Sequence, residues 1–554
     1  MKKLAGGALG YSGSAALLSM RFREFAARRV LVGAVCVLTL FGLNVYVSLK
    51  LFGCEYTRSS RSTEGNFIAM SRLRMEHSGQ LEWRPYWAAR MPIQHTHSPL
   101  MPATVAAVGT QAGWTAALEG ASEGAVRRAL ARTTGTVRLP AGIIEVPVEL
   151  AIPRGAHDLE VTGDPAGTVL RATASFQGRA ILSCRSAARI RFSRFTVDGN
   201  RASLERRAGL PPYVAFAGFY SNNGILVEQA AGLTIQDVSF RNVASFPILV
   251  AASKDVLIQR VVIEDSGSRN EKGKNNTTGG ILLEEGTTDF RVEDCRIRNV
   301  RGNGIWTHSL YKSPRNQRGR IAGNQFENIG RDAIQVGHAV AVTVTDNTGK
   351  RIGYPAGEVD VENGGFPVAI DTAGNVERSF YSANHFEEID GKCIDLDGFH
   401  HGEVRDNVCI NRGRPEDYPF GNYGIVMNNA NPDMKSEWIT IADNEIDGTL
   451  YSGMLVIGSN HKIVRNRLRN LNLARCNDNR ARCTWLLATE PEFLRSGIYL
   501  ARGAARPDPA RANRIEANEV SGYGIAQHCI VAAPGVSLAA NTVVGNRCGV
   551  SSGK

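Results

Sequence analysis

The sequence lacks the cysteine patterns of a metal-binding protein. Its ten cysteines include no CxxC pair and no cysteine–histidine pair at zinc spacing, which excludes zinc-finger and zinc-ribbon domains. Cys476 and Cys483 bracket a hydrophilic loop and predict a local disulfide in an exported protein. Cys393 and Cys409 either pair across one structural repeat or stay reduced in the interior, and the sequence leaves both interpretations open.

The chain also lacks an excess of positive charge over most of its length, although its formal net charge is +11. Residues 1–62 contain nine Lys and Arg against two Glu, so this short segment carries +7 of the excess. The other 492 residues keep only +4 and are nearly balanced. Nucleic-acid binding calls for a clustered basic surface, so we expect no nucleic-acid partner.

One uncharged run is long enough to cross a bilayer. Val30 to Leu49 is twenty residues without a charge, and Arg21, Arg23, Arg28 and Arg29 precede it. This bias predicts a single-pass membrane protein with its N-terminus in the cytoplasm and the remainder periplasmic or extracellular. Two alternatives are a cleaved signal peptide and a lipoprotein anchor at Cys54.

This run divides the chain into four parts. Residues 1–29 are interpreted as a cytoplasmic segment, 30–49 as the transmembrane helix and 50–112 as a linker. The linker is polar and aperiodic and contains Pro85, Pro92, Pro99 and Pro102. Residues 113–554 form the folded domain.

Aromatic residues are few (7%) and glycines many (58), a composition typical of short strands and turns. Trp114 to Arg132 has apolar residues at helical spacing and predicts an amphipathic helix with one buried face. GTVRLPAG, from Gly135, then combines a strand with turn signals. Further short strands follow at intervals of about ten residues, which indicates an all-β architecture.

From Gly224 onward the chain repeats one unit, about thirty residues long on average. Each unit starts with a small residue followed by an apolar strand. The starts are GILVE at 224, ILV at 248, GILLE at 280, GIWTH at 304, AIQVG at 333, AIDTA at 369, CIDLD at 393, GIVMN at 424, GMLVI at 453, GIYLA at 497 and GIAQH at 524.

An asparagine recurs in phase with these starts. We expect it at a tight bend, because asparagine tolerates the left-handed backbone region, and we expect the amides of successive coils to bond to one another in a ladder. The predicted members are Asn324, Asn347, Asn384, Asn407, Asn444, Asn466, Asn518 and Asn541.

These features together resemble the pectate-lyase-like superfamily. The capping helix, the GTVRLPAG start and Val197-Asp198-Gly199-Asn200 in an early coil are similar to features of that group. The resemblance covers roughly residues 110–550 and implies a single-stranded right-handed parallel β-helix, a solenoid with an N-terminal capping helix. It implies the fold specifically and the activity only loosely, because this scaffold serves many chemistries.

Two neighbouring repeats carry candidate catalytic acids. In VAIDTAG (368–374) and KCIDLDGFHH (392–401) apolar and polar residues alternate, so Ile370 and Ile394 face inward while Asp371, Asp395 and Asp397 face outward on one side. Stacked coils bring these carboxyl groups together on one face. Stacked like charges are unfavourable unless a cation, a shared proton or a substrate offsets them.

Long loops around the acids predict a groove. We expect His308 and His400 to orient the acids or contact substrate, and Trp306 to offer a stacking face to a sugar. Other candidate substrate-binding residues are Gln335, Lys312, Lys392, Arg405 and His338.

Three functions follow from these acids and from the resemblance. As in the polygalacturonase-like branch, Asp371 and one of Asp395 or Asp397 would hydrolyse a polysaccharide with inversion, although the Gly-His-Gly and Arg-x-Lys motifs of that branch are missing. A calcium-dependent lyase or uronate epimerase would use the acids as Ca²⁺ ligands. A non-catalytic carbohydrate-binding or cell-envelope structural protein would only bind in the groove. Otherwise we expect no metal or cofactor.

Overall fold

The computed structural model describes residues 71–75, 81–85, 122–205, 213–361, 365–431, 433–479, 483, 492–503 and 506–550. The segments interpreted as cytoplasmic (1–29) and transmembrane (30–49) lie outside the described residues. Within the described part, no helix has the length and apolarity needed to span a bilayer. Two compact units are present. In one of them, β1 (Ser71–Met75) and β2 (Leu81–Pro85) form an antiparallel hairpin within the stretch interpreted as a linker.

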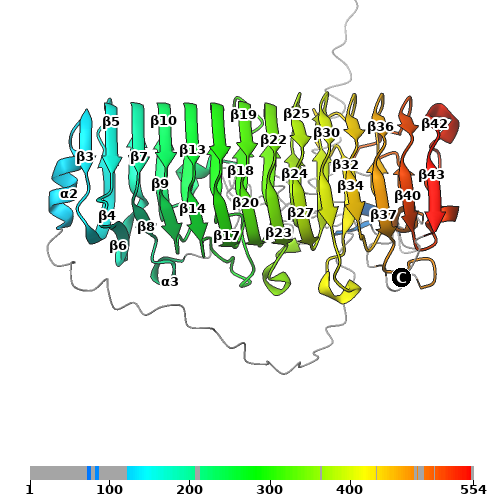
Figure 1. Ribbon diagram of the computed structural model, residues 1–554, viewed down its shortest axis with the longest axis horizontal. Helices are drawn as coiled ribbons and strands as arrows, with labels where there is room; N and C mark the ends of the chain where they lie inside the picture. The colour runs from blue at the N-terminus through cyan, green and yellow to red at the C-terminus, as the bar shows by residue number, and fades with distance from the viewer. Residues whose placement is uncertain are drawn as a thin grey trace, which may run out of the picture. The chain divides into compact units, whose positions relative to one another are not determined.

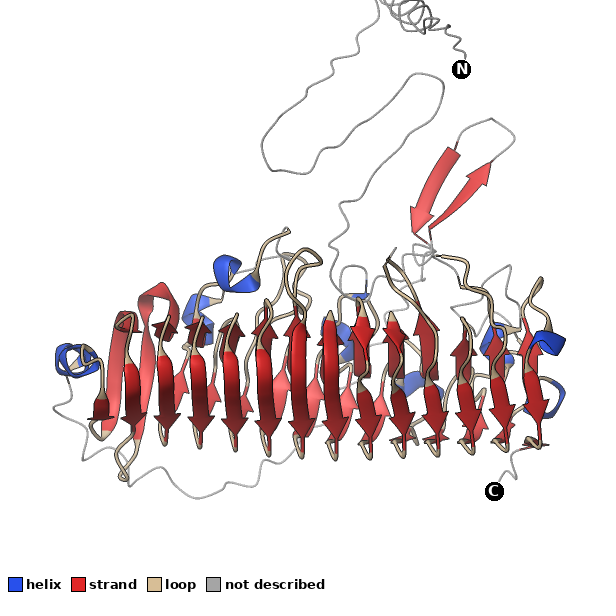
Figure 2. Ribbon diagram, turned by 90° about the horizontal axis from the view of Figure 1, so that it is seen from above, coloured by secondary structure: helices blue, strands red, loops and turns tan. Residues whose placement is uncertain are grey.

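The other unit is a solenoid of parallel strands arranged in three rows. Within each row the strands stand side by side along the long axis of the solenoid (Figure 1). Seen from the perpendicular direction, the strands of different rows lie in separate layers (Figure 2). One coil runs through row 1, row 2 and row 3 in that order, as in β9, β10 and β11.

Row 1 carries the repeat starts seen in the sequence. Its strands are β9 (Asn223–Glu228), β12 (Ile248–Ala251), β15 (Ile281–Glu284), β18 (Ile305–His308), β21 (Ile334–Gly337), β24 (Val368–Ala373), β28 (Lys392–Asp397), β32 (Tyr423–Asn428), β35 (Met454–Val456), β38 (Ile498–Leu500) and β41 (Ile530–Ala532).

Row 2 forms a sheet of its own, in which β25 and β29 pair beside the main path. Its strands are β3 (Gly135–Arg138), β5 (His157–Thr162), β7 (Ala188–Ser193), β10 (Ala231–Gln236), β13 (Lys254–Gln259), β16 (Thr288–Glu293), β19 (Asn316–Ala322), β22 (Ala339–Thr345), β25 (Val376–Glu377), β26 (Phe380–Ser382), β29 (Phe399–His400), β30 (Glu403–Arg405), β33 (Thr440–Ala442), β36 (Lys462–Val464), β39 (Arg514–Glu516) and β42 (Thr542–Val544).

Row 3 joins row 1 at the N-terminal end, where the long strands β4 (Gly142–Ile152) and β6 (Thr168–Arg185) pair and β6 continues into both rows. The other strands of row 3 are β8 (Thr196–Asp198), β11 (Ser239–Arg241), β14 (Val262–Glu264), β17 (Arg296–Val300), β20 (Gln325–Ile329), β23 (Thr348–Ile352), β27 (His385–Ile389), β31 (Val408–Ile410), β34 (Glu445–Asp447), β37 (Arg467–Leu471), β40 (Glu519–Gly522) and β43 (Arg547–Val550).

Helices are short. They are α2 (Glu123–Leu130), α3 (Arg201–Leu204), α4 (Phe216–Phe219) and the 3₁₀ turns η1 (Ala356–Glu358), η2 (Pro415–Asp417), η4 (Phe493–Arg495), η5 (Ile525–Gln527) and η6 (Leu538–Ala540). The predicted helix over Trp114–Arg132 corresponds to α2, and residues 114–121 lie outside the described part. Ser122 caps α2, while Val126 and Leu130 bury one face in the solenoid core as the pattern predicts.

The predicted asparagine ladder is present, with one correction. Each side-chain amide donates to the side-chain oxygen of the next member at 2.8–2.9 Å, from Asn324 through Asn347 to Asn518. The last member is Asn546 instead of Asn541, which bonds to Asn513 in a neighbouring turn.

The asparagine itself does not adopt the left-handed conformation. The residue before it does, as in Asp346 (φ 56°), Asp406 (φ 55°) and Ala517 (φ 55°). The ladder therefore satisfies buried backbone and amide groups, and the preceding residue makes the bend.

Three disulfides are formed within the described ranges. Cys476–Cys483 is the predicted local pair, Cys393–Cys409 crosses from row 1 to row 3, and Cys529–Cys548 was not foreseen. The last predicted repeat start is displaced, because residues 525–527 form η5 and the row 1 strand of that coil is β41.

Candidate active site

Three neighbouring strands of row 1 place polar side chains on the outer face of the solenoid. Gln335 of β21 pairs in register with Asp371 of β24, which pairs with Asp395 of β28. Ile370 and Ile394 belong to the core, so the aspartates point away from it. The predicted register is confirmed, and it places Asp371 and Asp395 on strands about 4.8 Å apart.

Strand β28 adds two further charged groups. Cys393 and Ile394 both belong to the core, whereas the side chain of Lys392 reaches Asp395 on the outer face. Its Nζ donates to Oδ2 of Asp395. Asp397 follows two residues after Asp395 on the same face, about 6.5–7 Å along the strand.

The acids are closed off from solvent. Asp371 and Asp395 are 0% exposed and Asp397 is 3% exposed. The backbone N–H of Ala430 donates to Oδ1 of Asp397 (3.0 Å), and the amide of Asn431 donates to the hydroxyl of Tyr311 (2.8 Å). The open groove predicted from the loops is therefore not observed, because the loop after β32 bonds directly to an acid.

Burial raises the pKa of all three aspartates, but not equally. For Asp371 the largest cause is desolvation, reinforced by the charges of Asp332 and Asp395, and its pKa lies well above the ordinary value. Burial also raises the pKa of Asp395, and Lys392 opposes that shift. Burial and the neighbouring Asp395 raise the pKa of Asp397 to about 7. Lys392 thus opposes the rise in pKa most directly at Asp395, the aspartate to which it is bonded.

Several buried polar atoms around these acids have no hydrogen-bond partner. Buried polar atoms are nearly always paired in folded proteins, so their gathering on one face makes this face the candidate site. They are Oδ1 and Oδ2 of Asp371, Oδ1 of Asp395, Nε2 of Gln335, Nδ2 of Asn428, Oδ1 of Asn429 and Nδ1 of His338.

Asp332 extends the group and was missed from the sequence. Its Oδ1 accepts from the N–H of Val368 (3.0 Å), and its own N–H donates to Asn303 (3.3 Å), whose amide reaches Gln335 (2.5 Å). Burial raises the pKa of Asp332 to about 7. The sequence pattern that could have predicted Asp332 is the position two residues before the inward isoleucine. In three of the repeats this position holds a polar residue: Asn303, Asp332 and Lys392. We call Asp332, Asp371, Asp395 and Asp397 the aspartate cluster.

Trp306 and His308 belong to a different neighbourhood of the same face. Trp306 is buried against Phe216 of α4, with ring centroids 5.0 Å apart, and offers no open face to a sugar. The ring of His308 lies 4.6 Å from that of Phe216. The helix α4 covers the apolar half of the outer face, so these two side chains serve packing there.

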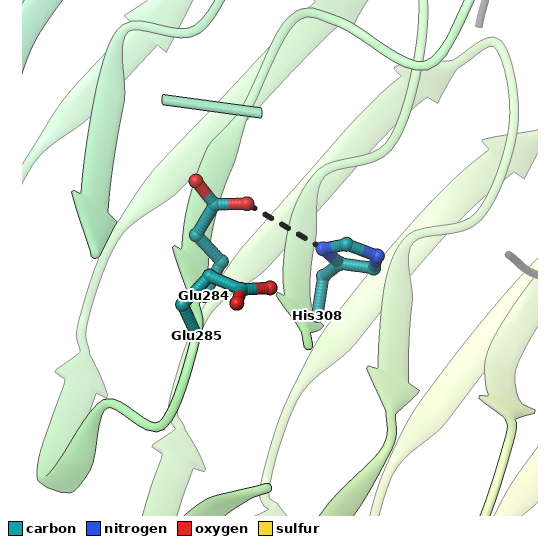
Figure 3. A group of neighbouring side chains, drawn as sticks. All are labelled: Glu284, Glu285 and His308. Atoms are coloured by element: carbon teal, nitrogen blue, oxygen red, sulfur yellow. Dashed lines mark ion pairs between the residues drawn. The ribbon is translucent and has the colours of Figure 1, made fainter. Parts of the chain in front are cut away.

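Glu284, Glu285 and His308 are the group that could hold a metal ion in the described part of the chain. Their ligand atoms lie within 4.8 Å of one another, and both carboxylates approach the imidazole (Figure 3). Glu284 already accepts the N–H groups of Phe216 (2.9 Å) and Ala217 (2.6 Å), and its Oε2 lies 3.5 Å from Nδ1 of His308. Glu284 therefore fastens α4 to the solenoid. The aspartate cluster is not such a group.

The remaining predicted residues lie around the acids at different places. His338 follows β21, with its ring 4.6 Å from that of Tyr311, and burial lowers its pKa to about 4, so it is a neutral imidazole. Lys312 is exposed, with its ammonium over the ring of Tyr213.

His400 and Arg405 lie in row 2, a sheet that does not contain the acids. His400 Nε2 is 2.9 Å from Oδ1 of Asn375. Arg405 is partly exposed and pairs with Asp406 at 3.4 Å. The structure therefore joins Gln335, Lys392 and the three aspartates, and it does not place Arg405 beside them.

Comparison with known proteins agrees with this architecture. A family model described as a right handed beta helix region matches residues 180–357. No curated protein matches the chain significantly.

Several solved structures are similar at low identity. An exopolygalacturonase from Thermotoga maritima has 12% identity, a TM-score of 0.39 and coverage of 60% of this chain and 82% of the other. A polygalacturonase from Erwinia carotovora ssp. carotovora has 14% identity and a TM-score of 0.41, and the match covers 58% of this chain and 89% of the other. The ORF18 protein of Geobacillus virus E2 has 13% identity and a TM-score of 0.39. That match covers 50% of each chain, so this chain spans about half of that protein.

The stacked strands extend on both sides of the region that the family model matches. Parallel strands stack coil upon coil through residues 135–550, and the matched region lies inside that stack. The chain therefore has the fold of a right-handed parallel β-helix, and its residues 180–357 match the family model of that description.

Proposed function

We propose that the protein binds a polysaccharide at the aspartate cluster and hydrolyses a glycosidic bond there. The observation that carries this proposal is that two carboxyl groups on β28 have different bonding partners. Asp395 is paired with the buried ammonium of Lys392, while Asp397 is held by a single backbone N–H and has its pKa raised to about 7. Paired carboxyl groups pushed toward different protonation states are what general acid–base catalysis needs.

In this proposal Asp397 is the acid and Asp395 is the base. Asp397 donates its proton to the leaving glycosidic oxygen as the bond from that oxygen to the anomeric carbon breaks. Asp395 takes a proton from a water molecule whose oxygen bonds to the same carbon from the opposite face. Alternate residues of one strand are about 6.5–7 Å apart, which fits the separation of inverting enzymes, about 6.5–9.5 Å. The proton that Asp395 has gained returns through solvent to Asp397.

Asp371 is a weaker candidate for the acid than the sequence indicated. Burial and the charges of Asp332 and Asp395 raise its pKa well above the ordinary value, whereas the pKa of Asp397 is about 7, close to neutral pH. A general acid works best with a pKa near the operating pH. Asp371 would instead bind the substrate by a hydrogen bond, and Tyr311 and the loop after β32 would have to part to admit the substrate.

The experiment measures release of reducing ends over a panel of polysaccharides. Asp397→Asn and Asp395→Asn should each lower kcat by about 10²–10⁴-fold, the usual contribution of a general acid or base. Asp255→Asn, an exposed aspartate of row 2, is the matched control and should leave kcat unchanged. Cleavage that survives both cluster substitutions would contradict the mechanism.

Other outcomes of the same panel identify the alternatives. Calcium-dependent formation of an unsaturated, ultraviolet-absorbing product would indicate a lyase. Binding without any cleavage would indicate the non-catalytic carbohydrate-binding protein.

We also propose that residues 30–49 anchor the protein in the membrane and that the solenoid lies outside the cytoplasm. The three disulfides support export, because such bonds persist mainly in oxidising compartments. Protease added to intact cells or spheroplasts should digest the solenoid and spare a tag at the N-terminus. Protection of the solenoid until the membrane is lysed would refute this placement.

A further inference from the structure

We propose that the sugar bound against Asp371 carries an ammonium group, so that the substrate is an amino-sugar polysaccharide rather than a polyuronate. This inference rests on the proposed function, because it names the substrate class of the same site. It follows from the hydrogen-bonding capacity and the charges that face the aspartate cluster.

The unpartnered oxygens around the cluster outnumber the unpartnered amide nitrogens. The two oxygens of Asp371, Oδ1 of Asp395 and Oδ1 of Asn429 lack donors. The unpartnered amide nitrogens are Nε2 of Gln335 and Nδ2 of Asn428. The carboxylate of a uronic acid only accepts hydrogen bonds, whereas an ammonium group donates three. A ligand rich in donors therefore matches this face better than one that brings another carboxylate.

Several cations of the described residues nearby are already engaged. Lys392 is paired with Asp395, and Arg315 is paired with Glu377 at 3.0 Å. The charge of Arg331 acts on Asp332, and Arg506 donates to the backbone carbonyl of Asn431 at 2.7 Å. His338 is neutral, because burial lowers its pKa to about 4. A polyuronate would thus have to compete for cations that other groups already contact.

The charges around Asp371 favour a bound cation beside its carboxyl group. Asp332, Asp395 and Asp397 all disfavour ionisation of Asp371, and the neighbouring charge of Lys392 favours it. An ammonium group at hydrogen-bond distance would act in the same direction as Lys392, so its binding would expel the proton of Asp371. A uronate would have the opposite effect and would bind against the repulsion of its neighbours.

Calorimetry on the full chain tests this inference. The probes are a short glucosamine oligomer, its fully N-acetylated counterpart and a galacturonate oligomer of equal length, each titrated in two buffers of different ionisation enthalpy. The glucosamine oligomer should bind about 10–100-fold more tightly than the acetylated form, as charge-assisted hydrogen bonds imply, and should release protons. Asp371→Asn should remove both the preference and the proton release. The comparison of amine and acetamide on the unaltered protein needs no variant.

The outcomes separate this inference from the proposed function. Tighter binding of galacturonate, or equal binding of amine and acetamide, would overturn the amino-sugar assignment. Cleavage of either glycan that depends on Asp395 would then still uphold hydrolysis. If none of the three oligomers binds and no polysaccharide is cleaved, both proposals fall.

Discussion

Replacing Lys392 with methionine should lower the free energy of unfolding by about 3–5 kcal/mol, the usual cost of removing one partner of a buried ion pair. The ammonium is the pairing partner of Asp395, and both side chains are almost completely buried. Methionine fills similar volume without charge, so the loss reports the uncompensated carboxylate. Urea unfolding followed by circular dichroism measures the change.

Two controls make the result specific. Lys392→Met combined with Asp395→Asn should recover most of the loss, because no buried charge is then left unpaired. Lys350→Met removes the ammonium of an exposed pair with Glu388, 3.7 Å apart, and should cost less than about 1 kcal/mol. A double variant as unstable as the single one would show that Lys392 stabilises by packing instead.

The second large effect is a loss of stability as the pH rises from 5 to 8. Burial raises the pKa of six described aspartates. The pKa is about 7 for Asp332 and Asp397, about 8 for Asp390 and well above its ordinary value for Asp371, and it is also raised for Asp395 and Asp508. Each binds a proton in the folded state that it releases on unfolding. The stability this contributes is complete below the unfolded pKa, near 4, and is lost as the pH rises through the folded pKa.

Two buried histidines act in the opposite direction over part of this range. Burial lowers the pKa of His338 and His461 to about 4, so their contribution is lost as the pH falls below about 6.5. Asp332, Asp371, Asp390 and Asp397 set against these two histidines leave a net stability loss of about 2–3 kcal/mol per pH unit between about pH 5 and 6.5, at 1.36 kcal/mol per proton. Above about pH 6.5 the histidines no longer oppose the aspartates, so the loss per pH unit is larger until the aspartates ionise in the folded state. Urea midpoints at pH 5 and pH 8 measure it, and Asp390→Asn should flatten the upper part of the profile. A midpoint equal or higher at pH 8 would contradict the raised values.

The sequence predicted the parts of this structure that repeat. Inward isoleucines at one phase indicated which residues face the core, so Asp371 and Asp395 could be predicted to lie in register on one face, as they do. A period of two along a strand, copied over many coils, leaves little freedom in register. The asparagine ladder was predictable for the same reason, although its last member was misassigned at an irregular end.

The parts that do not repeat were not predictable. Whether Trp306 faces a sugar or Phe216 depends on α4, which lies far away in the sequence and has no periodic pattern. The closure of the aspartate cluster depends on a backbone N–H at Ala430, and backbone donors leave no trace in the residue pattern. Asp332 was overlooked because only two of the three outward positions of each repeat were considered.

The asparagine ladder has a consequence for how such a molecule changes over generations. Its successive members are separated by 23, 37, 23, 37, 22, 52 and 28 residues, yet the chain of amides is unbroken. Insertions are thus absorbed beside the ladder without moving the strands that carry the acids. Mutation can therefore lengthen, shorten or replace the loops that cover the acids without moving the acids themselves, which under the proposed function would change the glycan that is admitted.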